Sequence, residues 1–165
     1  MKTTLVIVDT RNLRHNLSKT YNRDRLDFTK YLSWAVGDDM ILAAKAYGSP
    51  LTAESSQNFI KMLRAQGFEI CFTDPIVKPG QDDVEKKDIF HIDPSVAMSI
   101  DALELCLTGK IDRVVIGSSS PQLAPLVTAL RRRGIVVDIL ASRVTRALHH
   151  VASSVVEIPE DLLLN

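Results

Sequence analysis

Short apolar runs rich in β-branched residues alternate along this chain with longer segments that carry apolar residues every three or four positions. The short runs predict strands buried on both faces, and the longer segments predict amphipathic helices. We expect strands at 4–8, 40–47, 68–72, 113–116, 135–140 and 154–158. We expect helices at 26–36, 54–66, 94–107, 121–133 and 145–151. This order predicts an α/β fold with a mostly parallel central sheet and helices on both faces.

The length and composition fit one domain over residues 1–165. Of the 165 residues, 45% are hydrophobic, which is enough to fill a core. Residues 74–92 depart from the alternation because they contain Pro75, Pro79, Gly80 and the charged stretch DDVEKKD. They predict a long loop or hairpin insertion, and loops of this length are often functional.

The charge balance restricts the partners that this chain can recruit. Twenty basic and twenty acidic residues leave a formal net charge of zero, which argues against coating nucleic acid through overall charge. A local basic patch beside an acidic site stays open.

No segment approaches the roughly 18–20 apolar residues of a membrane span. Cys71 and Cys106 have no CxxC spacing, so we expect neither a zinc site nor a disulfide scaffold. This use of cysteine fits a reducing compartment, and we therefore expect a cytoplasmic location.

Polar residues follow the first strand, in VDTRNL. Ligands of parallel α/β sheets bind outside the carboxyl ends of the strands, where the strand order reverses. Asp9 could therefore ligate Mg²⁺ or Mn²⁺, which favour oxygen ligands, and Asn12 could contact a phosphate or orient Asp9. The alternative is that Asp9 or Asn12 caps the segment that follows.

Two further places could contribute to the same crevice. Asp101 lies inside an otherwise apolar helical segment, where aspartate is a poor helix former. It could project toward Asp9 or lie on the surface. The run GSSSPQ after the fourth strand offers hydroxyl and amide groups for an anion or for a helix N-cap. Its candidate substrate-binding residues are Ser118, Ser119, Ser120 and Gln122.

Partners are suggested by two other features. Arg11 and Arg14 begin beside Asp9 and are candidates for phosphate contacts to RNA. The apolar tail at 162–164 could be buried in a homodimer or could fold back on its own domain.

Three segments together resemble a known family. VIVDTRNL, SVAMSIDAL and VVIGSSSPQLAPLVTALRRRGIVVDIL resemble the NYN domains, specifically their LabA-like branch within the PIN-like nuclease superfamily. The resemblance runs from about residue 4 to residue 158. It implies a three-layer, Rossmann-like PIN fold and a ribonuclease that uses Mg²⁺ or Mn²⁺ held by carboxylates. It implies that Asp9, Asn12 and Asp101 are catalytic, with Asp9 and Asp101 as metal ligands.

This sequence departs from the family pattern at three acidic positions. Ser95, Ser120 and Gln122 stand where the family keeps aspartates. Two remaining carboxylates would hold a metal ion only weakly, through water. Asp93 is close in sequence to Ser95, but on a helix it would point elsewhere. Acids of the long loop could swing in, namely Asp82, Asp83 and Asp88.

Three functions therefore stay open. The first is a weak metal-dependent ribonuclease with an altered site. The second is a non-catalytic NYN-fold regulatory protein that binds RNA, a nucleotide or a protein partner. The third is an α/β domain that binds a small molecule or a nucleotide and shares only the architecture with that family.

Overall fold

Six parallel strands form the central sheet, in the order β3-β2-β1-β6-β7-β8. The computed structural model describes residues 1–49, 54–77 and 89–165. The sheet confirms the predicted α/β class. Its strands are β1 (Thr3–Asp9), β2 (Met40–Gly48), β3 (Phe68–Phe72), β6 (Arg113–Gly117), β7 (Val136–Ala141) and β8 (Ser154–Glu157).

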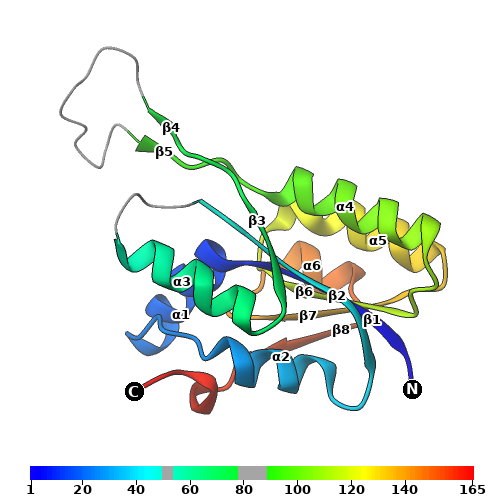
Figure 1. Ribbon diagram of the computed structural model, residues 1–165. Coiled ribbons are helices and arrows are strands. Elements are labelled where there is room, and N and C mark those ends of the chain that lie inside the picture. Colours follow the sequence, from blue (N-terminus) through cyan, green and yellow to red (C-terminus); the bar gives the residue numbers. More distant parts are fainter. Residues whose placement is uncertain (50–53, 78–88) are drawn as a thin grey trace.

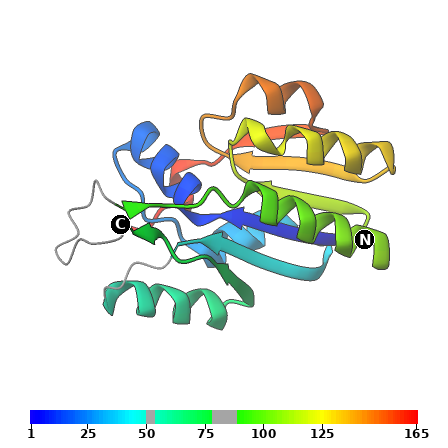
Figure 2. The same cartoon turned by 90° about the horizontal axis from the view of Figure 1, so that it is seen from above.

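Helices cover both faces of the sheet and complete three layers. α2 and α3 lie on one face, whereas α4, α5 and α6 lie on the other (Figures 1 and 2). Right-handed crossovers require this division, since the chain winds outward in two directions from β1. The helices are α1 (Thr10–Tyr21), α2 (Phe28–Val36), α3 (Glu54–Ala65), α4 (Ser95–Thr108), α5 (Ala124–Arg132) and α6 (Arg146–Val151), with short 3₁₀ turns η2 (Pro121–Leu123) and η3 (Glu160–Leu162).

Helix α1 was not expected from the sequence. It begins directly after Asp9 and buries only Thr10, Leu13 and Leu17, so most of its surface is polar. An apolar stripe this narrow gives a weak periodic signal. Its presence places the arginines that follow β1 on an ordered helix.

A small hairpin precedes α4. β4 (Ile76–Val77) pairs antiparallel with β5 (Ile89–Phe90), outside the central sheet (Figure 1). Most of the predicted insertion at 74–92, including Asp82, Asp83 and Asp88, lies at residues 78–88, outside the described residues.

The winding of the sheet reverses between β1 and β6. The carboxyl ends of strands at such a reversal are where doubly wound sheets bind ligands. The two strands approach closely at Gly117, since a Cβ there would lie 2.7 Å from both Val8 Cγ1 and Tyr31 Oη. The close packing of β1 and β6 therefore requires glycine at the end of β6.

The carboxyl-terminal tail folds back on its own domain. Leu162 and Leu163 are buried, and Leu163 forms an isolated antiparallel bridge with Leu26. The N–H of Leu164 donates to the Arg25 carbonyl. The tail therefore folds back on its own domain, which is one of the two alternatives expected from the sequence. The homodimer stays a prediction.

No helix in the described part of the chain has the length and apolar character needed to cross a bilayer. Cys71 and Cys106 are free thiols, both partly buried.

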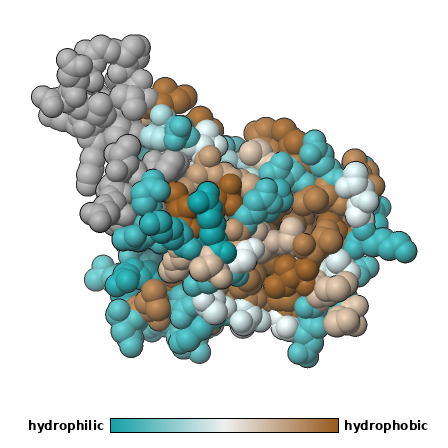
Figure 3. Space-filling view, in the orientation of Figure 1, coloured by the Kyte–Doolittle hydropathy of each residue, from teal (hydrophilic) through white to brown (hydrophobic). Residues whose placement is uncertain are grey.

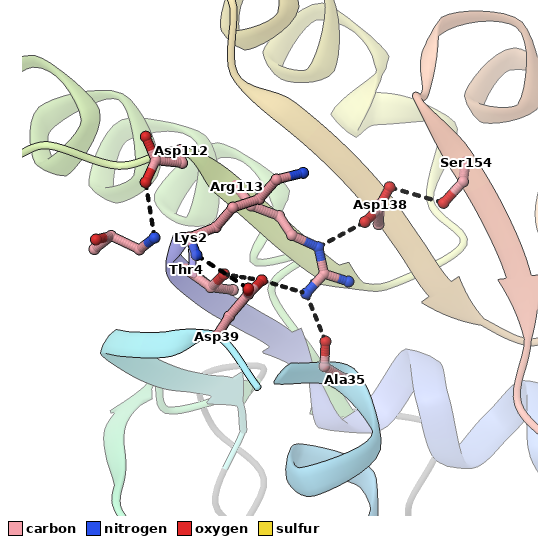
Figure 4. A network of polar contacts seen from close by, with 9 residues as sticks. Lys2, Thr4, Ala35, Asp39, Asp112, Arg113, Asp138 and Ser154 are labelled. Atoms are coloured by element: carbon pink, nitrogen blue, oxygen red, sulfur yellow. Dashed lines mark hydrogen bonds and ion pairs between the residues drawn. The ribbon is translucent and has the colours of Figure 1, made fainter. Parts of the chain in front are cut away.

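Arg113 ties several elements together at the amino end of the sheet (Figure 4). Its Nε donates to Asp138 Oδ2 at 2.6 Å, and its Nη1 donates to the Ala35 carbonyl at 2.7 Å and lies 3.6 Å from Asp39 Oδ2. Asp138 also accepts from the Ser154 hydroxyl. These half-buried contacts connect α2, β6, β7 and β8.

We expect Arg113→Met to lower the free energy of unfolding by about 2–4 kcal/mol, because it leaves the largely buried Asp138 carboxylate without its cation. Urea unfolding measures the change. Glu160→Gln is the control, because it removes an exposed partner of Arg23 and should cost less than about 1 kcal/mol. Equal effects of the two substitutions would contradict the structural role of Arg113.

Candidate functional site at the carboxyl end of the sheet

A hollow of about 260 Å³ lies in the crevice beyond β1 and β2. We call it the Asp9 hollow. The residues that line it come from the start of α1, the end of β2 and the segment before α4. They are Asp9, Arg11, Asn12, His15, Gly48, His91, Ile92, Asp93 and Pro94.

Asp9 is the buried carboxylate of this hollow. It ends β1 and caps α1, because its Oδ1 accepts the Asn12 backbone N–H at 3.1 Å. The capping alternative is therefore observed, and the same side chain also lines the hollow. Burial raises the pKa of Asp9 to about 6, and the nearby Asp93 charge adds to this effect. Asp9 thus titrates close to neutral pH.

Asn12 connects α1 to the loop after β6. Its Oδ1 accepts the Ser119 N–H at 2.9 Å and the Ser119 hydroxyl at 3.1 Å. Asn16 donates to Ser119 Oγ at 2.9 Å. The amide oxygen of Asn12 is therefore used within the protein, and its remaining capacity toward the hollow is that of an NH₂ donor.

The serines after β6 are buried and bond to one another. Ser118 Oγ accepts the Ser120 N–H, and Ser120 Oγ accepts the Gln122 N–H as the N-cap of η2. Ser95 at the start of α4 donates to Ser120 Oγ at 3.3 Å. Two positions that resemble family aspartates are therefore in direct contact, as hydroxyls. None of these serines, nor the exposed Gln122, lines the Asp9 hollow.

Asp101 lies in a different hollow from Asp9. Its Oδ2 accepts the Tyr47 hydroxyl at 2.6 Å, and it lines a space with Lys45 and Glu104 along α4. Burial and this carboxylate raise the pKa of Tyr47, which keeps the hydroxyl protonated as a donor. The hollow that Asp9 lines and the hollow that Asp101 lines share no residue, so these two hollows place the predicted metal ligands apart.

Three lining residues were missed by sequence reasoning. Asp93 was expected to point away on a helix, but α4 begins only at Ser95, and Asp93 Oδ1 accepts the Ser95 N–H at 2.8 Å. Asp93 therefore reaches the hollow from the turn before the helix. His15 and His91 also line it, and burial together with the Arg11 charge lowers the pKa of His91. No motif in the sequence marked these histidines.

The predicted phosphate-binding arginines lie on one side of the hollow. Arg11 lines the Asp9 hollow, and both Arg11 and Arg14 line a second, adjacent hollow of about 400 Å³. Hydrophilic side chains prevail at the end of the molecule that carries α1 and α3 (Figure 3), whereas hydrophobic ones gather toward β2 and α4.

The donor set determines what metal chemistry this crevice can support. Among the described residues, no group of three or more His, Cys, Asp or Glu side chains is placed to hold a metal ion. Asp9 and Asp93 are the two carboxylates of the hollow. Serine hydroxyls and an amide are weak substitutes for carboxylates toward Mg²⁺ or Mn²⁺. The residues present therefore do not fit a tightly held divalent ion.

Comparisons with known proteins agree with this architecture. The family model for the NYN domain matches residues 3–159. A crystal structure of a protein of unknown function from Vibrio parahaemolyticus superposes with a TM-score of 0.82, at 23% identity, over 99% of this chain and 96% of that chain. No curated protein sequence matches the chain.

We expect Asp9→Asn to stabilise the protein above neutral pH by about 1–3 kcal/mol. A folded-state pKa of about 6, against 3.8 for the ordinary carboxyl, means that the folded protein binds the proton more tightly. The stability contributed by Asp9 is thus full below about pH 4 and is lost as the pH rises through about 6. Asparagine caps helices equally well.

Chemical unfolding in chelator-containing buffer at about pH 8 and about pH 4 measures this change. The gain should vanish at the lower pH. The control is Asp38→Asn, in the exposed turn before β2, which should leave stability nearly unchanged at both values. A destabilised Asp9→Asn protein at the higher pH would contradict the assignment.

Proposed function

The chain belongs to the NYN domain family, and from this premise we propose that it binds RNA at the Asp9 hollow. The proposed site is of ribonuclease type but has lost several aspartates, so that it holds RNA and cuts it slowly or not at all. The hydrogen bond between Ser95 and Ser120 carries this proposal. Both positions resemble those of family aspartates, and here two neutral hydroxyls satisfy each other.

The charge of the hollow supports binding without a metal ion. A dense carboxylate cluster repels a phosphodiester unless cations intervene. Here Asp9 and Asp93 are the acids of the hollow, and Asp9 is partly protonated near neutral pH. Arg11 and His15 lie beside them on α1. A phosphate could therefore approach with the arginine as its counter-ion.

The chain's own residues divide the binding roles. Arg11 and Arg14 supply charge to the RNA backbone from successive turns of α1. Asn12 offers its NH₂ group to the hollow, and its Oδ1 holds the loop after β6 in place. Ser118–Ser120 act as the support of this loop, since their hydroxyls bond within the protein.

A second candidate function is a slow metal-dependent ribonuclease. It is favoured by Asp93, which sets a second carboxylate beside Asp9. A bound Mg²⁺ or Mn²⁺ would polarise the phosphate and activate water, with Asp9 and Asp93 as the residues to hold it. The binding proposal above extends to a non-catalytic regulatory protein that binds RNA, a nucleotide or a protein partner. The LabA-like branch and a cytoplasmic location stay predictions from the sequence.

Restoring the missing acids separates the two candidates. We expect the Ser95→Asp/Ser120→Asp double variant to cut a labelled single-stranded RNA with Mn²⁺ at least about tenfold faster than the natural chain. The two added carboxylates would adjoin Asp93, whose Oδ1 accepts the Ser95 N–H, and would help to hold the ions. Mn²⁺ should also raise the unfolding temperature of the double variant and not that of the natural chain.

Two controls accompany this experiment. Thr108→Asp adds an acid at the far end of α4 and should change neither cutting nor the response to Mn²⁺. Asp9→Asn placed in the double variant should abolish its cutting. If the natural chain already cuts RNA with Mn²⁺ as fast as the double variant, and Asp9→Asn abolishes that activity, the protein is a nuclease and the binding proposal is wrong.

A further inference from the structure

The second hollow beside the Asp9 hollow has its own chemistry. We call it the aromatic pocket; Thr10, Arg11, Arg14, His15, Ser18, Asp24, Ser49, Phe59, Phe72 and His91 line it. Three of these residues, Arg11, His15 and His91, also line the Asp9 hollow, so the two spaces adjoin. Its volume of about 400 Å³ falls in the range of small-molecule sites.

Two phenylalanine rings form one wall of the aromatic pocket. Phe59 of α3 and Phe72 at the end of β3 are stacked, with ring centroids 6.5 Å apart and planes inclined by 29°. Both side chains are only partly buried. Gly48 lets the Phe72 ring pack closely against the end of β2, since a Cβ at Gly48 would lie 3.2 Å from the ring. The rings thus present apolar faces next to a polar hollow.

A guanidinium group lies over the same wall. Arg14 Cζ is 5.9 Å from the centroid of the Phe59 ring, and an ion pair of 3.1 Å with Asp24 holds the guanidinium there. Aromatic faces beside arginine are the means by which proteins hold unpaired bases of single-stranded nucleic acid.

Two polar atoms of the pocket wall lack partners. Ser49 Oγ and His91 Nδ1 are buried, and neither has a hydrogen-bond partner among the described residues. Buried polar atoms are nearly always paired in folded proteins, and an unpaired one calls for a partner from outside. The edge of a nucleobase, or a ribose hydroxyl, carries groups that pair with a hydroxyl and an imidazole nitrogen.

We propose that the aromatic pocket receives an unpaired base of single-stranded RNA, stacked on Phe59 and Phe72, next to a phosphate bound at the Asp9 hollow. This inference rests on the proposed function, since the RNA is the same ligand. It goes further because it assigns a base-stacking site, separate from the phosphate site, and selects single-stranded over paired RNA. A base within a duplex is stacked on its neighbours and cannot enter the pocket.

The test compares an intact single-stranded RNA of about ten nucleotides with versions that lack one base at each position in turn. Fluorescence anisotropy measures their affinity for the full chain. We expect one abasic position to weaken binding about tenfold. Phe72→Leu keeps the apolar volume without the aromatic face; it should bind intact RNA about tenfold more weakly and no longer distinguish the abasic version. Phe59→Leu should have the same effect as Phe72→Leu. Its folding is checked separately, because Phe59 also packs on Phe28.

The matched control is Trp34→Leu, which removes a partly buried aromatic ring of α2 that packs on Tyr31. It should keep the full discrimination against the abasic RNA. Equal affinity of the natural chain for intact and abasic RNA, or for single-stranded and duplex RNA, would overturn the stacking site and leave the proposed RNA binding standing. A natural chain that binds none of these RNAs would overturn both.

Discussion

The reversal of winding between β1 and β6 is the constraint on which this structure depends. Two parallel strands can lie side by side while the chain winds outward in opposite directions only if their connections leave the sheet on opposite faces. The carboxyl ends of β1 and β6 are then covered by neither set of helices. Gly117 permits the close approach of the two strands, and Asn12 joins α1 to the loop after β6 by accepting two hydrogen bonds from Ser119. The crevice is therefore built by the fold and does not depend on a bound ion.

What fills this crevice differs from what its position suggests. Ser95 and Ser120 bond to each other, and Asp101 is held by Tyr47 in a separate hollow. Asp9 is left with Asp93 as its acidic neighbour in the hollow, and its burial brings its pKa to about 6. Loss of carboxylates weakens the affinity for divalent ions and at the same time lowers the repulsion of phosphate. Serines in place of aspartates at the strand ends would thus account both for RNA binding without a metal ion and for slow or absent cutting.

Sequence reasoning predicted the layers of this fold well and the site only in part. Mostly apolar runs such as 4–8 and 113–116 favour strands buried on both faces of a parallel sheet, and the structure confirms that architecture. Helix α1 was missed because Leu13 and Leu17 form too narrow a stripe. Asp93 was misplaced because sequence reasoning treated it as part of the helix, whereas it precedes α4 and its Oδ1 accepts the Ser95 N–H. The aromatic pocket was not foreseen because Arg14, Phe59 and Phe72 come from three distant segments that only the tertiary fold brings together.

We infer that the crevice binds RNA through its own residues and without a metal ion. The affinity of the natural chain for a single-stranded RNA, measured in EDTA and again with Mg²⁺, tests this most directly. We expect binding in EDTA that Mg²⁺ does not strengthen and that weakens as monovalent salt increases, since arginine contacts to phosphate release counter-ions. Binding that disappears in EDTA and returns with Mg²⁺ would contradict it, because the ion would then be the phosphate ligand.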